Sequence, residues 1–139
     1  MTWSADELVA TYLRALNDAD HRLAVSLFAD GGIVHSPLYG PRPALDFYPA
    51  LFADTSQASL TLKSVMTGKD QSGRTTVSFW FDFDWRLPSG AAAPFEVVDV
   101  ATVGADEKIQ ELHIIYDTVY VRPAYEAEVG KPSWRRPHG

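Results

Sequence analysis

The segment from residue 75 to residue 87 limits the possible folds of this chain more than any other part of the sequence. Large apolar residues alternate there with mostly polar ones. The apolar set is Val77, Phe79, Phe81, Phe83 and Trp85, and the set between them is Ser78, Trp80, Asp82, Asp84 and Arg86. Successive side chains of a β-strand point to opposite faces of a sheet. The segment therefore predicts a strand with a buried aromatic face and a more polar outer face.

Further extended segments are predicted on both sides of this strand. Three of them lie near residues 60–65, at residues 95–103 and at residues 109–121. Earlier in the chain, the Asp30-Gly31-Gly32 string favours a turn, because glycine reaches positive φ without steric cost. A short extended stretch at residues 33–36 follows that turn.

The N-terminal third of the chain has helical periodicity instead. Ser4 and Glu7 form a capping box ahead of a first amphipathic helix, and Asp20 caps a short second helix. Pro43 suits the first position of a third helix, in which Pro49 predicts a kink or two short turns. Helices followed by a run of antiparallel strands indicate an α+β fold.

Length and composition favour one ordinary domain. The chain has 139 residues, of which 46% are hydrophobic and 22% are charged. We expect residues 1–121 to form the domain and residues 122–139 to form a loosely held C-terminal tail. The formal net charge of −6 argues against nucleic acid as a partner. No apolar run approaches the roughly 20 residues of a membrane span, and no signal peptide is visible, so we expect a cytoplasmic protein with no membrane partner.

Several kinds of chemistry have no counterpart in the sequence. There is no cysteine, and the four histidines at positions 21, 35, 113 and 138 lack metal-ligand spacing. A glycine-rich phosphate loop is also missing. We therefore expect neither a metal nor a cofactor, which leaves acid–base chemistry or plain binding of a ligand.

Several strings resemble the nuclear transport factor 2-like superfamily, especially its ketosteroid isomerases and SnoaL-like polyketide cyclases. The resemblance runs from about Ser4 to about Tyr120 and is strongest at residues 27–37, 96–100 and 109–112. It implies a cone-shaped fold in which about three N-terminal helices pack on a strongly curved antiparallel sheet. An apolar pocket for a small hydrophobic molecule would open between the two layers.

The resemblance also implies which residues line that pocket. The aromatic face of the 75–87 strand would point into it, together with side chains from the third helix and the last strand. The expected lining is Phe47, Tyr48, Phe79, Phe81, Phe83, Trp85 and Tyr116. The alternative is that these aromatic residues only fill a core.

Two residues match the isomerases' hydrogen-bond donors to a developing enolate oxygen. These are Tyr12 in the first helix and Asp99 in a central strand. A carboxyl group among valines loses hydration, so its neutral form is favoured and it can donate a hydrogen bond. Alternatively, Asp99 is a hydrogen-bonded structural acid and Tyr12 is a core residue.

The catalytic base of the isomerases has no clear counterpart. Its position is occupied by Ser36, and a serine hydroxyl needs an activating partner to move a proton. The neighbouring His35 points to the opposite side if the segment is extended. Asp117 is another candidate, but it alternates with Tyr116, so only one of the two can face the pocket unless a bulge intervenes.

The leading hypothesis is a cofactor-free isomerase, cyclase or lyase acting on a small carbonyl compound. Tyr12 and Asp99 would stabilise an enolate, with the base open among His35, Asp117 and an ordered water. The alternative is a non-catalytic binding domain that has lost its base, which Ser36 favours. We also expect a homodimer through the outer face of the sheet. Trp80 lies among the polar, outward-facing residues of its strand, and a second subunit would shield this large apolar side chain from water.

Overall fold

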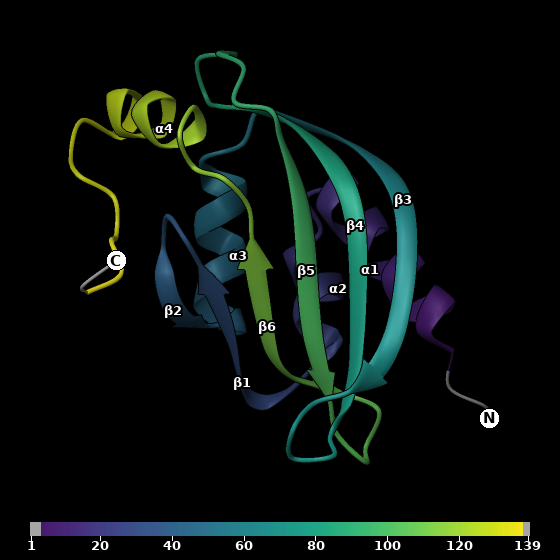
Figure 1. Ribbon diagram of the computed structural model, residues 1–139. Coiled ribbons are helices and arrows are strands. Elements are labelled where there is room, and N and C mark those ends of the chain that lie inside the picture. The colour runs from purple at the N-terminus through teal and green to yellow at the C-terminus, as the bar shows by residue number, and fades with distance from the viewer. Residues whose placement is uncertain (1–3, 138–139) are drawn as a thin grey trace.

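One sheet covered on one face by helices forms the body of the molecule. A computed structural model describes residues 4–137 (Figure 1). The sheet order is β2-β1-β6-β5-β4-β3. The strand bounds are β1 (Phe28–Ser36), β2 (Gly40–Pro43), β3 (Gln57–Lys69), β4 (Thr75–Arg86), β5 (Phe95–Val103) and β6 (Ile109–Ile115). The sheet is curved and open, and the predicted α+β class is confirmed.

One strand pair departs from the predicted antiparallel sheet. β1 and β6 run parallel, while all other neighbouring strands are antiparallel. Parallel neighbours need a long connection. The chain between β1 and β6 supplies one, because it forms β2, a helix and the β3–β4–β5 meander before it returns.

In the described part of the chain, four helices accompany the sheet. Their bounds are α1 (Ala5–Asn17), α2 (His21–Ser26), α3 (Ala44–Ala53) and α4 (Val121–Val129). The amide of Glu7 donates to Ser4 Oγ at 3.3 Å and the amide of Leu23 donates to Asp20 Oδ1 at 3.1 Å, which confirms both predicted N-caps. Within residues 4–137, no helix is long and apolar enough to cross a membrane.

Helix α3 is one continuous element although it contains Pro49. The two short turns that the sequence allowed are not seen. Proline removes the hydrogen bond to the carbonyl four residues earlier, here that of Leu45. Leu45 is 69% exposed, so this turn of the helix lies at the surface.

The alternation of β4 is confirmed residue by residue. Its five apolar side chains from Val77 to Trp85 are all buried, and the residues between them are exposed or half-buried. In the antiparallel ladder, Phe79 lies opposite Asp99 and Phe81 lies opposite Val97. Directly opposite residues share a face of the sheet, so Asp99 points inward with the aromatic side chains.

The predicted turn at residues 30–32 lies inside β1 instead. Gly31 has a φ of +76°, and the pairing of β1 with β6 is irregular between Phe28 and Ile33. Glycine at positive φ therefore makes a bulge within the strand rather than a turn at its start. At the other end of the sheet, the predicted strand at residues 109–121 stops at Ile115.

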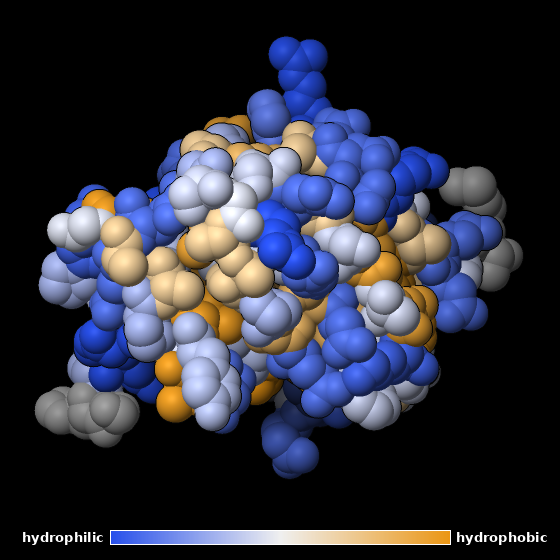
Figure 2. All heavy atoms as spheres, turned by 90° about the horizontal axis from the view of Figure 1, so that it is seen from above, coloured by the Kyte–Doolittle hydropathy of each residue, from blue (hydrophilic) through white to orange (hydrophobic). Residues whose placement is uncertain are grey.

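The described part of the C-terminal segment, up to residue 137, packs on the body of the molecule, which differs from the expected loosely held tail. Helix α4 lies at one end of the sheet (Figure 1), where apolar residues reach the surface between hydrophilic ones (Figure 2). Val121 and Tyr125 are buried, and the ring of Tyr125 stacks on Trp85 with centroids 5.9 Å apart. Arg122 donates to the carbonyl of Pro37 at 3.1 Å. The domain limit at residue 121 stays a prediction, but the segment after it packs on the domain.

Candidate functional site

A small cavity lies between the inner face of the sheet and the helices. Its walls are mostly apolar, and its lining residues are Tyr12, Leu16, Ser36, Leu38, Tyr39, Leu51, Phe81, Phe83, Trp85, Phe95, Val97, Asp99, Ile114 and Tyr116. The cavity volume is ≈ 40 Å³. One water needs about 10–15 Å³, and a cavity that binds benzene has about 150 Å³. A ring-sized ligand therefore requires some lining side chains to move.

Seven of the twelve predicted site residues line this cavity. They are Tyr12, Ser36, Phe81, Phe83, Trp85, Asp99 and Tyr116. Phe47, Tyr48 and Phe79 do not line it, although all three are buried. They pack behind Tyr12 instead: Phe79 meets the Tyr12 ring edge to face at 5.4 Å, and Phe47 meets Tyr48 at 4.9 Å. For these three, the core-filling interpretation describes the structure better.

His35 and Asp117 lie away from the cavity. Because β1 is extended, Ser36 points inward and His35 points to the outer face, where its Nε2 lies 3.1 Å from Glu111 Oε2. Asp117 follows the end of β6 and is exposed, and its Oδ1 accepts a hydrogen bond from the amide of Val119 at 3.0 Å. Of the neighbouring residues Tyr116 and Asp117, Tyr116 is the one that lines the cavity. Neither candidate base therefore reaches the site.

Asp99 is a buried acid without a cationic neighbour among the cavity-lining residues. Its side chain is 1% exposed, and Oδ1 has no hydrogen-bond partner among the described residues. Burial raises the pKa of Asp99 well above its usual value, and the nearby Tyr12 hydroxyl only partly opposes this. The protonated form is favoured, so the carboxyl group can donate a hydrogen bond into the cavity.

Tyr12 is oriented by a second tyrosine behind it. The hydroxyl of Tyr48 donates to the hydroxyl of Tyr12 at 2.9 Å. Burial raises the pKa of both phenols, and the neighbouring Tyr48 and Asp99 raise that of Tyr12 further. Both tyrosines therefore stay neutral. Because Tyr12 accepts from Tyr48, its own proton is free to point toward Asp99 or a ligand oxygen.

Ser36 shapes the wall of the cavity next to the β1–β2 connection. Its Oγ accepts hydrogen bonds from the amides of Leu38 and Tyr39, each at 3.2 Å. These two hydrogen bonds close the turn. The hydroxyl proton of Ser36 is then still able to donate a hydrogen bond. Among the lining residues, Asp99 is the single carboxylic acid, and none is a histidine. The described part of the site therefore offers hydrogen-bond donors but no evident base.

Several lining residues were missed by sequence reasoning. Phe95 stacks on Tyr116 with ring centroids 4.0 Å apart and on Phe83 at 5.1 Å. The spacing of two residues between Phe95, Val97 and Asp99 along β5 could have predicted that Phe95 faces the cavity. Tyr39, whose hydroxyl donates to Asp54 Oδ2 at 2.6 Å, gave no such signal, because it lies in the connection before β2.

Comparison with known proteins gives a family-level match. The family model described as a SnoaL-like domain matches residues 9–112. No curated protein sequence matches the chain at a significant level.

Solved structures of the same fold are numerous. The epoxide hydrolase/cyclase-like enzyme SalBIII, described in pyran ring formation in the polyether salinomycin, is 17% identical with a TM-score of 0.68, covering 84% of this chain and 92% of that one. A Δ5-3-ketosteroid isomerase from Mycobacterium sp. is 17% identical with a TM-score of 0.63, covering 84% and 95%. A putative polyketide cyclase from Pseudomonas putida KT2440 is 15% identical with a TM-score of 0.61, covering 86% and 96%. At these identities the likeness shows the shared fold.

Proposed function

Because this chain belongs to the SnoaL-like domain family, we propose that its cavity binds a small hydrophobic molecule through one oxygen atom of that molecule. The oxygen accepts hydrogen bonds from Tyr12 and Asp99. The observation that carries the proposal is the buried Asp99 carboxyl group, whose Oδ1 has no partner among the described residues. An unsatisfied buried polar group costs about 1–3 kcal/mol, which a ligand oxygen would recover.

The chemistry of the site narrows the ligand class. Two neutral donors favour an acceptor oxygen, such as that of a ketone, an enolate or a phenolate. The walls around these donors are aromatic and aliphatic, so the rest of the ligand is apolar. Phe95, Ile114 and Tyr116 are the lining residues that are only partly buried, so we expect the wall to open there when a ring enters.

Calorimetric titration with matched one-ring compounds tests this function. A phenol and a cyclic enone should bind, and the same rings without oxygen, toluene and cyclohexene, should bind at least several-fold more weakly. Equal affinities within each pair would contradict recognition through an oxygen atom. A failure of all four compounds to bind up to their solubility limits would contradict the proposed cavity function itself.

Cofactor-free catalysis on a carbonyl compound is a second candidate function. The arrangement in which Tyr48 supports Tyr12 beside Asp99 favours it, because such donors stabilise the charge that develops on an enolate oxygen. Proton removal would still need a base, which neither His35 nor Asp117 can supply from its place in this structure. Binding is therefore the function that the geometry supports better.

The Ser36→Asp variant separates the two candidates. We expect the wild-type protein not to isomerise a one-ring β,γ-unsaturated ketone, while the variant gains measurable activity. A positioned base contributes about 10²–10⁴-fold, and the amides of Leu38 and Tyr39 should reduce this gain because they lower the pKa of the introduced carboxylate. An absorbance assay for the conjugated product measures both rates. Robust turnover by the wild-type protein would show that it has a base.

A homodimer through the outer face of the sheet remains a proposal. Trp80, Val98 and Ile115 lie side by side on β4, β5 and β6, and Trp80 and Ile115 are 38% and 57% exposed. Covering this apolar stripe with a second copy would remove it from water. Light scattering should show a dimer at micromolar concentration, shifted toward monomer by Trp80→Ser but not by Leu45→Ser on α3. A monomeric wild-type protein would overturn this proposal.

A further inference from the structure

We propose that the outer face of the sheet carries a separate site for a divalent transition-metal ion, with zinc as the best-fitting candidate. The site is formed by His35, Glu111 and His113. It lies on the opposite side of the sheet from Asp99 and does not depend on the cavity function.

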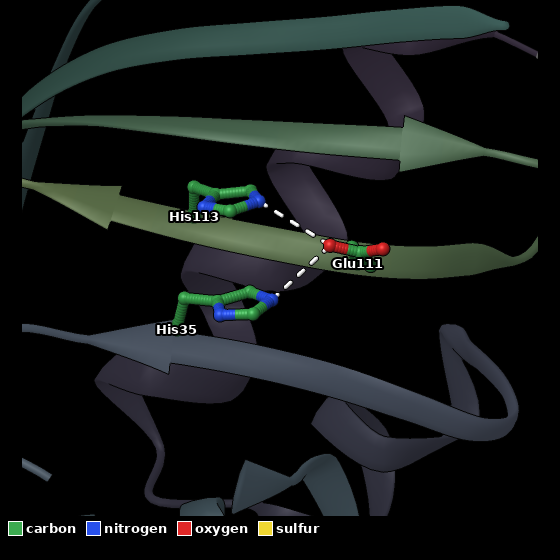
Figure 3. A group of neighbouring side chains, drawn as sticks. All are labelled: His35, Glu111 and His113. Carbon is green, nitrogen blue, oxygen red and sulfur yellow. Dashed lines mark hydrogen bonds and ion pairs between the residues drawn. The ribbon is translucent and has the colours of Figure 1, made fainter. Parts of the chain in front are cut away.

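The strand register brings the three side chains together. His35 on β1 is directly opposite His113 on the parallel strand β6. Glu111 precedes His113 by two residues and therefore shares its face of the sheet. Figure 3 shows both imidazole rings directed toward the Glu111 carboxylate between them.

The distances between the potential ligand atoms fit one small cation. Glu111 Oε2 lies 3.1 Å from His35 Nε2 and 3.3 Å from His113 Nε2. The three ligand atoms all lie within 4.8 Å of one another. Around tetrahedral zinc with bonds of about 2.0–2.2 Å, ligand atoms are roughly 3.3–3.6 Å apart. The two carboxylate-to-imidazole distances are already close to that spacing, while the imidazole rings have to turn.

The main movement is a tilt of the two imidazole rings. In the structure they are stacked, with centroids 4.1 Å apart and planes 4° from parallel. A common metal ion has to lie near both ring planes, so the Nε2 edges must turn toward each other. The torsion between Cβ and an imidazole ring is broad, so this rotation costs little. The side chains are between 34% and 45% exposed, which gives an ion access.

The donor set indicates the class of metal. Two imidazole nitrogens and one carboxylate oxygen suit zinc and its borderline neighbours rather than calcium or magnesium, which prefer oxygen ligands. Three protein ligands leave a fourth position for water or an anion. The depression beside the site also contains Trp134 and Arg136. The Arg136 charge opposes a cation there and would favour an anionic fourth ligand.

A competing explanation is a surface histidine–glutamate cluster without a metal. Such ion pairs are common and contribute little to stability. Here, however, one carboxylate oxygen and two imidazole nitrogens from adjacent strands lie within 4.8 Å of one another, so a single ion can contact all three. The sequence spacing did not reveal it, because His35 and Glu111 are 76 residues apart.

Zinc binding by tag-free protein tests the proposal. Competition with a chromophoric chelator at slightly alkaline pH, where imidazoles are neutral, should give one zinc ion per chain. His35→Gln and His113→Gln should each weaken binding by at least about 10-fold, since losing even an outer-shell partner costs about 10–100-fold. His21→Gln is the matched control, because His21 is exposed on α2, and it should bind zinc like the wild-type protein.

Two results would overturn the proposal. One is wild-type protein that takes no zinc from the chelator. The other is zinc affinity that stays unchanged in both His35→Gln and His113→Gln. Circular dichroism of each variant shows whether it is folded. Cobalt substitution gives a second readout, because an intense visible absorption is expected for a tetrahedral site in the wild-type protein and should be lost in His113→Gln.

Discussion

Replacing Asp99 with leucine is expected to weaken the binding of a phenolate in the cavity by about 10- to 100-fold. The leucine is apolar and similar in size, so the change removes the hydrogen bond and preserves much of the packing. A hydrogen bond to a charged group contributes about 1.5–3 kcal/mol, and each 1.4 kcal/mol corresponds to a tenfold change in affinity. Calorimetry with a one-ring phenol that is ionised at neutral pH measures the difference.

The Asp99→Asn variant is the matched control for this experiment. Its amide group keeps a donor at nearly the same place, so phenolate affinity should stay close to that of the wild-type protein. The pH dependence should also differ. Raising the pH through the elevated pKa of Asp99 ionises the carboxyl group, removes its donor proton and weakens phenolate binding in the wild type but not in Asp99→Asn. Unchanged phenolate affinity in folded Asp99→Leu protein would remove Asp99 from the site.

Removing residues 121–139 is expected to lower the free energy of unfolding by about 3–6 kcal/mol. The estimate counts the burial of Val121 and Tyr125, at about 1.5–3 kcal/mol for each fully buried apolar side chain. The truncation also exposes the Trp85 ring that Tyr125 covers and deletes the hydrogen bond from Arg122 to Pro37. Urea unfolding followed by tryptophan fluorescence measures the loss.

A pair of tyrosine substitutions controls for the truncation. Tyr125→Ala should reproduce a large part of the destabilisation, since its side chain is buried. Tyr120→Ala, at a position that is 84% exposed, should have little effect. A truncated chain with the same urea midpoint as the full chain would mean that α4 contributes nothing to stability.

The sequence predicted the central part of the fold because its signal is local. The alternation along β4 depends only on neighbouring residues, and it fixed which aromatic side chains are buried. The N-caps at Ser4 and Asp20 depend on residues three positions apart. The inward placement of Asp99 followed from the resemblance and agrees with its register opposite Phe79.

The features that were missed depend on contacts between distant segments. No local pattern in the sequence shows that Tyr48 supports Tyr12, because the two residues lie on different helices, α3 and α1, 36 positions apart. The parallel pairing of β1 with β6 was also invisible, and with it the approach of His35 to Glu111. The direction of the Asp117 side chain was ambiguous, because the alternation of side chains along a strand does not show where β6 ends.

The protonation state of Asp99 is the central claim, because only a neutral carboxyl group can donate to a ligand oxygen. Carbon-13 NMR of the labelled aspartate carboxyl groups, with Asp99→Asn used to assign the signal, measures that state directly as a function of pH. The burial of Asp99 predicts a carboxyl shift that still has the protonated value at neutral pH, with its titration displaced upward. An Asp99 signal that titrates near pH 4 and is ionised at neutral pH would contradict the account.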